Sequence, residues 1–295
     1  MLMVHLLKLM ADYSIMINEA NFQKILDEVI DNKDKVIVLY SGLWSFIHEL
    51  NFKLKNPNQI PEIILNIIED KIGKEKTLFL PAFTGKSFST KKIFEIDKDI
   101  DKGNGYVPLT ALKRGYYRTR QPIHSYLVYG DLKEVKKLKL QSSWGRNSLL
   151  EYFSKKNARI CNMGLPWNKG CAYLHRFDQI YKVPWRYNKK FSSAIVKNNK
   201  LVGTCHEIKY CSSALEPVSY DYKPFVRYIK KSDSFKKSKN QKISVESIKV
   251  SCLNKIGRKI FSKDPWIIVK NKKKTLNWIK NSKNKEINMQ KSINK

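Results

Sequence analysis

The first half of the chain alternates amphipathic segments with short apolar ones. Residues 22–31 space their apolar side chains at three and four, which is typical of an amphipathic helix. Residues 35–40 form an almost continuous apolar run, as strands buried on both faces of a parallel sheet do. Residues 61–72 predict a helix with proline in its first turn and Gly73 just past its end, and residues 77–81 predict the next strand.

The same alternation continues toward the middle of the chain. Residues 125–130 and 158–164 predict two more strands, separated by a helix over residues 148–156. Helices and strands in this order indicate an α/β fold, with a layered, mainly parallel central sheet and flanking helices. Residues 194–210 contain a hairpin signal at Asn198-Asn199-Lys200, so a small antiparallel element is expected after the parallel part.

The composition changes beyond Tyr228. Residues 230–295 hold 20 basic and 4 acidic residues, and apolar content returns only between residues 243 and 278. We therefore expect a catalytic domain over 11–228 and a Lys-rich C-terminal segment over 229–295, partly helical and docked on the domain. Residues 281–295 carry too little apolar surface to offset the entropy of ordering, so this end is expected to fray.

The charge of the chain narrows the choice of partners. The net charge is +31 over 295 residues, but only 9 of the 57 basic residues are arginine. A surface built to follow phosphates would use more arginine, whose planar fork binds phosphate through two hydrogen bonds, so the pattern argues against nucleic acid as the main partner. The basic tail could hold the protein near an anionic membrane surface. Nothing in the sequence indicates an oligomeric state.

The remaining bulk features favour a cytoplasmic protein. The five cysteines form no C-x-x-C pair, as expected in a reducing compartment with neither a disulfide framework nor a metal site. No run approaches eighteen consecutive apolar residues, and residues 1–10 are too short for the core of a signal peptide.

Candidate chemistry is concentrated between Arg114 and Arg186, a stretch that holds seven of the nine arginines. Here His124 precedes a predicted strand, at the edge where α/β folds bind ligands. His175 and Asp178 are three residues apart on a predicted helix, so both can share one face, and an imidazole oriented by a carboxylate suits general-base catalysis. Glu207, on the second strand of the predicted hairpin, is a candidate for lining the acceptor pocket together with His124.

Several of these segments together resemble the aminoglycoside 3-N-acetyltransferase family. The matching segments follow the family's order along the chain. They are residues 40–43 (Y-S-G-L), 80–84 (L-P-A-F-T), 105–125 with its arginine, proline and serine spacing, 164–178 with its L-H element, and 183–187 (V-P-W-R-Y).

The resemblance implies acetyl transfer from acetyl-coenzyme A to a primary amine of a sugar-like ring, without metal or covalent enzyme intermediate. It implies that His175 removes a proton from the attacking amine and that Asp178 orients this imidazole. It also implies coenzyme A contacts from four residues, namely Ser41, Arg118, Thr119 and Ser125.

The sequence departs from the family pattern at positions that bear on activity. Asp178 stands where the family has glutamate, Gln121 where some members have histidine, and Cys171-Ala172 where the family has Asn-Thr. A catalytically lapsed homologue is therefore one alternative. A basic nucleic-acid-associated protein, with the aromatic and basic stretch 181–191 as a stacking surface, is the other.

The charge also bears on the acceptor. A strongly cationic protein repels a polycationic aminoglycoside and attracts an amino sugar carried on phosphate or a nucleotide. An amino-sugar precursor of surface polysaccharide is therefore favoured over an antibiotic. Salt screens this long-range effect.

Overall fold

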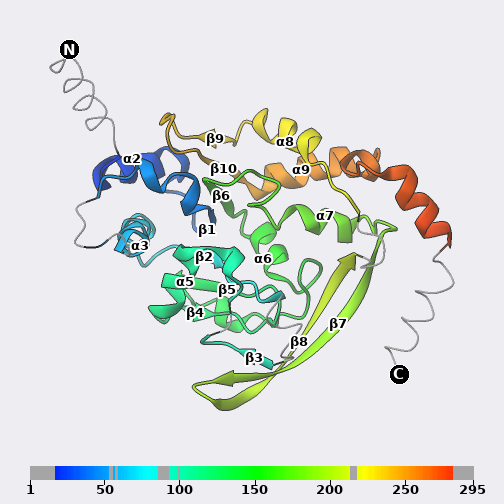
Figure 1. Cartoon of the computed structure of the whole chain (residues 1–295), viewed down its shortest axis with the longest axis horizontal. Coiled ribbons are helices and arrows are strands. Elements are labelled where there is room, and N and C mark those ends of the chain that lie inside the picture. Colours follow the sequence, from blue (N-terminus) through cyan, green and yellow to red (C-terminus); the bar gives the residue numbers. More distant parts are fainter. Residues whose placement is uncertain are drawn as a thin grey trace.

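The protein is described here by a computed structural model that covers residues 17–52, 56, 59–85, 93–98, 100–212 and 218–281 (Figure 1). The helices are α2 (Glu19–Val29), α3 (Ile60–Ile72), α5 (Tyr106–Lys113), α6 (Leu149–Lys155), α7 (Leu174–Ile180), α8 (Lys223–Lys230) and α9 (Val250–Phe261). The strands are β1 (Val36–Ser41), β2 (Thr77–Pro81), β3 (Ile93–Glu95), β4 (Tyr117–Arg118), β5 (Tyr126–Gly130), β6 (Arg159–Met163), β7 (Arg186–Lys197), β8 (Lys200–Ser212), β9 (Lys236–Lys237) and β10 (Val245–Lys249).

A seven-stranded sheet in the order β4-β5-β2-β1-β6-β10-β9 forms the centre of the molecule. β1 pairs in parallel with β2 on one side and with β6 on the other. The strands added outside these three pair antiparallel. The predicted α/β fold with flanking helices is confirmed, and the parallel pairing belongs to the three central strands.

Both faces of this sheet are buried, which explains the continuous apolar runs in the sequence. Side chains alternate along β1, so that Val36, Val38 and Tyr40 enter one core while Ile37 and Leu39 enter the other. Helices α6, α7, α8 and α9 cover the first core, and α2, α3 and α5 cover the second (Figure 1). The expected strand 77–81 coincides with β2, and the expected helix 61–72 lies within α3.

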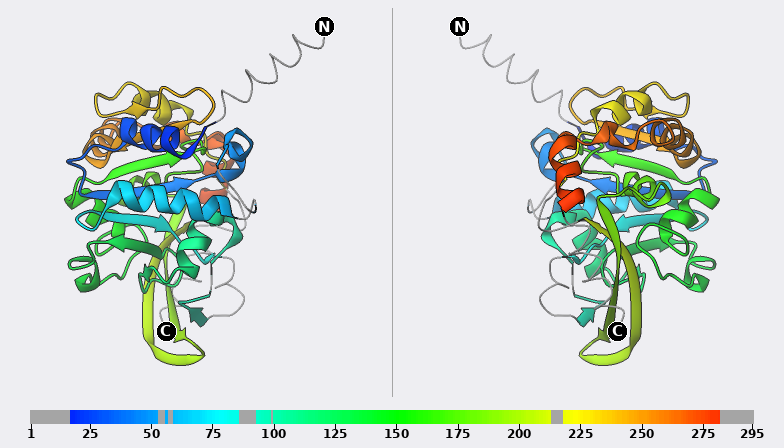
Figure 2. Two further views of the ribbon diagram at one scale, coloured as in Figure 1. Left: turned by 90° about the vertical axis from the view of Figure 1, so that its left-hand side faces the viewer. Right: turned by 90° about the vertical axis from the view of Figure 1, so that its right-hand side faces the viewer.

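A second sheet is built on a long hairpin. β7 and β8 pair antiparallel, with β3 along the edge of β7, and the hairpin projects from the body of the molecule (Figure 2). Asn198 and Asn199 turn the chain with φ of 49° and 61°, left-handed values that asparagine tolerates better than most residues. The predicted hairpin is confirmed, but it starts at Arg186 instead of Ala194 because polar residues in the first half of β7 conceal its strand pattern.

The segment after residue 228 does more than dock. β10 pairs with β6 inside the central sheet, and β9 pairs with β10 at the edge. Leu253, Ile260 and Phe261 of α9 are buried in the core beneath α6 and α7. The division at residue 228 stays a prediction, and the expected frayed end from 282 onward lies outside the described residues. No helix among the described residues is long and apolar enough to cross a membrane.

Candidate active site

A cavity of about 1320 Å³ opens at the carboxyl ends of β1, β2 and β6. This is the edge of the sheet where α/β folds bind ligands, and the volume exceeds that of a typical single-ligand pocket. The loops after β1 and β6 meet beneath it at Gly42. A Cβ atom at this position would lie 2.5 Å from the Leu165 side chain and 2.9 Å from the Gly164 carbonyl oxygen, so only glycine allows the approach.

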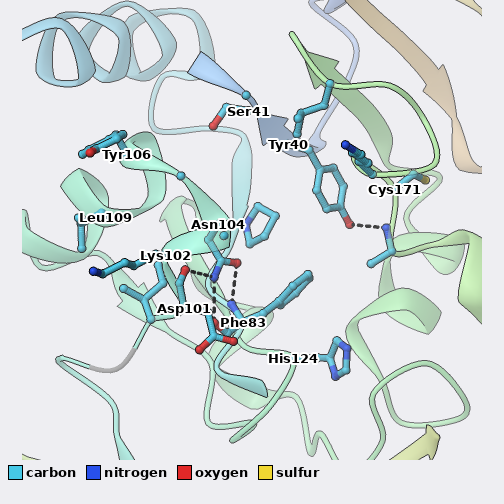
Figure 3. Close-up of a pocket in the computed structure, with 18 of the residues that line it drawn as sticks. Tyr40, Ser41, Phe83, Asp101, Lys102, Asn104, Tyr106, Leu109, His124 and Cys171 are labelled. Carbon is cyan, nitrogen blue, oxygen red and sulfur yellow. Dashed lines mark hydrogen bonds between the residues drawn. The ribbon is translucent and has the colours of Figure 1, made fainter. Parts of the chain in front are cut away.

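One side of the cavity carries exposed aromatic rings. Trp44 and Tyr106 are 68% and 47% exposed, and their ring centroids lie 5.5 Å apart. Figure 3 shows Tyr106, Leu109 and Lys102 on this side, with His124 and Cys171 opposite. Helix α5 begins at Tyr106, so its N-terminus, the end of a helix that attracts phosphate, borders the cavity.

Tyr40 lines the cavity between these two sides and pairs with the buried Tyr126. The hydroxyls of Tyr40 and Tyr126 lie 3.1 Å apart, and the backbone N–H of Ala172 donates to the Tyr40 hydroxyl at 3.3 Å (Figure 3). Burial raises the pKa of Tyr40 well above its ordinary value, so the phenol stays protonated and acts as a neutral hydrogen-bonding group.

His175 and Asp178 come together on α7 as predicted from their spacing. Nδ1 of His175 lies 3.3 Å from Oδ2 of Asp178, whose side chain is fully buried, whereas the imidazole is 32% exposed and lines the cavity. Burial lowers the pKa of His175, and this effect outweighs the opposing hydrogen bond from Asp178. The imidazole is therefore neutral at pH 7 and free to accept a proton.

Arg186 shares this carboxylate with His175. Its Nε lies 2.9 Å from Oδ2 of Asp178, and its guanidinium approaches Nδ1 of His175 at 3.3 Å. The same guanidinium stacks over the rings of Trp144 and Tyr220 at 4.9 Å and 5.4 Å. The arginine therefore fixes Asp178 and adds to the lowering of the His175 pKa.

A second imidazole–carboxylate pair faces the same cavity. Nδ1 of His124 lies 3.1 Å from Oε1 of Glu207, and the Glu207 side chain is fully buried. Its carboxylate also accepts hydrogen bonds from the Ser143 hydroxyl and from the backbone N–H groups of Ile123 and His124. These donors lower the pKa of Glu207 in spite of burial, while burial lowers that of His124.

Trp144 joins the two pairs. Its ring stacks on His175 with centroids 4.8 Å apart and meets His124 edge-on at 5.4 Å. Phe83 continues the row on the far side of His124 at 5.1 Å. The two imidazoles are thus held by aromatic rings on one wall of one cavity.

The residues predicted to contact coenzyme A divide into two groups. Ser41 lines the cavity at the end of β1. Arg118, Thr119 and Ser125 are buried behind the wall. Arg118 donates to Ser125 and to the Ala82 carbonyl, and Thr119 accepts from the Tyr126 backbone. Direct coenzyme A contact from these three stays a prediction, and their observed contacts are with the protein.

Sequence reasoning missed several residues that line this site. Trp144 lies in a loop with no periodic pattern, and Lys209 is the one lysine in the interior of β8. The signal for Lys209 was its spacing, because it lies two residues after Glu207 and therefore on the same face of β8. No group of three or more His, Cys, Asp or Glu side chains within the described ranges is placed to hold a metal ion.

The chain is similar to known proteins both in sequence and in fold. The sequence model of the aminoglycoside 3-N-acetyltransferase family matches residues 52–262. No curated protein matches the sequence. Three of the solved structures similar to the chain are AAC-IIIb in binary complex with CoASH, AAC-VIa bound to sisomicin, and the YokD protein from Bacillus subtilis.

These structural likenesses are extensive although the sequences have diverged. The AAC-IIIb complex has 14% identity and a TM-score of 0.66, over 84% of this chain and 97% of that one. The sisomicin-bound AAC-VIa has 11% identity and a TM-score of 0.63, over 83% and 97% of the two chains. YokD has 12% identity and a TM-score of 0.65, over 84% and 94%. At such identities the likeness establishes the fold.

The family match defines the class. The chain is an acyltransferase that uses acetyl-coenzyme A as co-substrate. It belongs to the aminoglycoside 3-N-acetyltransferase family, as the resemblance of its motifs predicted.

Proposed function

We propose that the protein transfers the acetyl group of acetyl-coenzyme A to a primary amine of an amino sugar, with His175 as general base. The observation that carries this proposal is the buried Asp178 carboxylate beside a cavity-lining imidazole. The family match supports the chemistry, and the sisomicin-bound relative supports an amino-sugar acceptor.

We assign the Nδ1 proton of His175 to the contact with Asp178, so the approach of Arg186 Nη2 to Nδ1 at 3.3 Å is electrostatic and not a hydrogen bond. When Nδ1 carries the proton and donates it to Asp178, the lone pair of Nε2 is free for the acceptor amine. An amine is protonated at neutral pH and cannot attack until it loses a proton, so a neutral imidazole is the required partner.

The transfer removes two protons from the acceptor nitrogen. The ammonium group first releases one proton to solvent, and the neutral amine nitrogen then forms a bond to the thioester carbonyl carbon as His175 takes the second proton. The C–S bond breaks, and the imidazolium returns the proton to the coenzyme A sulfur. Asp178 and Arg186 hold the ring in place throughout this sequence.

The coenzyme is best accommodated on the aromatic side of the cavity. Trp44 and Tyr106 offer exposed rings for the adenine base. Lys102 and the N-terminus of α5 suit the phosphates, and Ser41 at the end of β1 fits the predicted contact with the pantetheine.

Acetyl-coenzyme A-dependent acetylation of glucosamine and of sisomicin tests the proposal. The purified chain should release free coenzyme A only when an amine is present, and His175→Ala should abolish most of this release. His48→Ala is the matched control, because the His48 side chain is 68% exposed and lies outside the cavity. Coenzyme A binding without acetylation of any amine would favour the catalytically lapsed alternative.

A further inference from the structure

The cavity is cationic. Among the residues that the structure describes, its charged lining side chains are Lys98, Lys102, Lys169, Arg186, Lys209 and Asp101. Arg186 is neutralised by Asp178, and the four lysines outnumber the carboxylates of Asp101 and the nearby Glu207. A polycationic acceptor would meet repulsion inside the cavity as well as from the protein surface.

The carboxylate nearest to the second imidazole offsets one of these charges but is not available to bind a cation. Glu207 is fully buried and already accepts hydrogen bonds from the His124 ring, the Ser143 hydroxyl and two backbone N–H groups. Drawing it toward an ammonium group would leave these buried donors without an acceptor. Glu207 therefore holds the wall together instead of offering a site for a cation.

Lys209 lies where an acceptor would be recognised. It shares a face of β8 with Glu207, and it lines the cavity together with Cys211, His124 and His175. Its positive charge contributes to the lowered pKa of both imidazoles, which places it within electrostatic reach of both.

The hairpin places a second cation beside Lys209. Lys189 is directly opposite Lys209 across the β7–β8 ladder, where two like charges repel each other, and its ammonium lies 5.4 Å from the centroid of the Phe191 ring. Lys189 is not among the described residues that line the cavity. An anion bound between them would remove this repulsion. His124, which lines the cavity together with Lys209, lies apart from Tyr106, Leu109 and Lys102, the side assigned above to coenzyme A (Figure 3).

We propose that Lys209 is a specificity-determining residue and that the acceptor is an amino sugar that carries a phosphate group. This inference rests on the proposed function. In the inferred complex, the amine of the acceptor reaches His175 while its phosphate lies against Lys209. Lys189 adds to the positive charge there. A polycationic aminoglycoside is then a poor acceptor for this chain.

The kcat/KM values for glucosamine 6-phosphate, glucosamine and sisomicin test this inference. The intact chain should prefer glucosamine 6-phosphate to glucosamine by about tenfold, which is the effect expected of one charge-assisted hydrogen bond. This preference should decrease as the salt concentration is raised. Lys209→Gln should remove most of it, and Lys209→Glu should lower activity toward glucosamine 6-phosphate and raise it toward sisomicin.

Two controls separate the acceptor site from other causes. Lys200→Gln removes a charge from the exposed hairpin tip on the same strand and should leave the preference unchanged. The KM for acetyl-coenzyme A should be the same in the Lys209 variants as in the parent. An increase in this KM, with no change in acceptor preference, would assign Lys209 to the coenzyme and overturn the inference.

Binding measurements keep the inference separate from the proposed function. If none of the three amines is acetylated, the proposed function fails. Isothermal titration of glucosamine 6-phosphate and of glucosamine into the coenzyme A-loaded chain still tests the phosphate preference. Equal affinity for the two sugars, or acetylation of sisomicin with a kcat/KM above that of glucosamine 6-phosphate, would overturn the inference.

Discussion

The two imidazole–carboxylate pairs in the cavity contain the same chemical groups but are built differently. The Glu207 carboxylate accepts hydrogen bonds from four donor groups, two of which are backbone N–H groups. Its partner His124 is only 13% exposed. Asp178 is shared between Arg186 and His175, and His175 is 32% exposed. The comparison favours His175 over His124 as the proposed general base, because its imidazole is more accessible and its carboxylate is not needed to hold the backbone.

The largest difference between the pairs should be in the reaction rate. His175→Ala removes the group that accepts the proton, so we expect kcat/KM to fall by about 10²- to 10⁴-fold. Circular dichroism and Tm should stay close to those of the parent because His175 is partly exposed. A loss of less than tenfold in a folded variant would contradict its role as general base.

Glu207 should instead affect stability. Glu207→Gln replaces a carboxylate oxygen with an NH₂ group that faces buried donors, so the free energy of unfolding should fall by about 2 kcal/mol in urea denaturation. Glu134→Gln alters a glutamate that is 55% exposed and should change it by less than about 0.5 kcal/mol. Equal effects from the two substitutions would show that the Glu207 network contributes little.

His124 should have a smaller effect on turnover than His175. His124→Asn keeps a polar side chain near Glu207 but removes the imidazole from the cavity wall. We expect KM for the amino sugar to rise less than tenfold with kcat nearly unchanged, because His124 is predicted to contact the acceptor and not to accept its proton. A large fall in kcat with KM unchanged would instead indicate that His124 is the general base.

The smallest change should be in pH dependence. Burial and Arg186 lower the pKa of His175 below its ordinary value of 6.5, so kcat/KM should rise with pH through a first midpoint below that value and rise again as the acceptor amine loses its proton. Arg186→Gln removes a positive charge that opposes protonation, so the midpoint should move upward. Arg186→Lys keeps the charge and should keep the midpoint low, whereas a downward shift in Arg186→Gln would contradict this account.

The sequence predicted the fold well where burial is regular. β2 lies where the apolar run predicted it. Both of its faces are covered, so all of its residues are buried and the strand appears in the sequence as a continuous apolar run. β10 was missed because Glu246 and Lys249 interrupt its pattern. β10 pairs with β6, which lies far away in the sequence, so the local pattern of residues could not predict this pairing.

The candidate site was only partly predictable. The three-residue spacing of His175 and Asp178 on a helix predicted their contact, which the structure confirms, and the family motif implied roles that stay a proposal. The pairing of His124 with Glu207 joins residues 83 apart, and Trp144 reaches both imidazoles from a loop without a pattern. Arg118 occupies a position of the family motif but is buried. The spacing of the motif alone could not show whether its side chain contacts a ligand or the protein.

Chemical rescue tests the central claim most directly. His175→Gly and His124→Gly each leave a space beside the same cavity, and added imidazole can restore only a lost proton acceptor. We predict that imidazole raises the acetylation rate of His175→Gly in a saturable manner and leaves that of His124→Gly unchanged. Rescue of His124→Gly alone would contradict the assignment of His175 as general base.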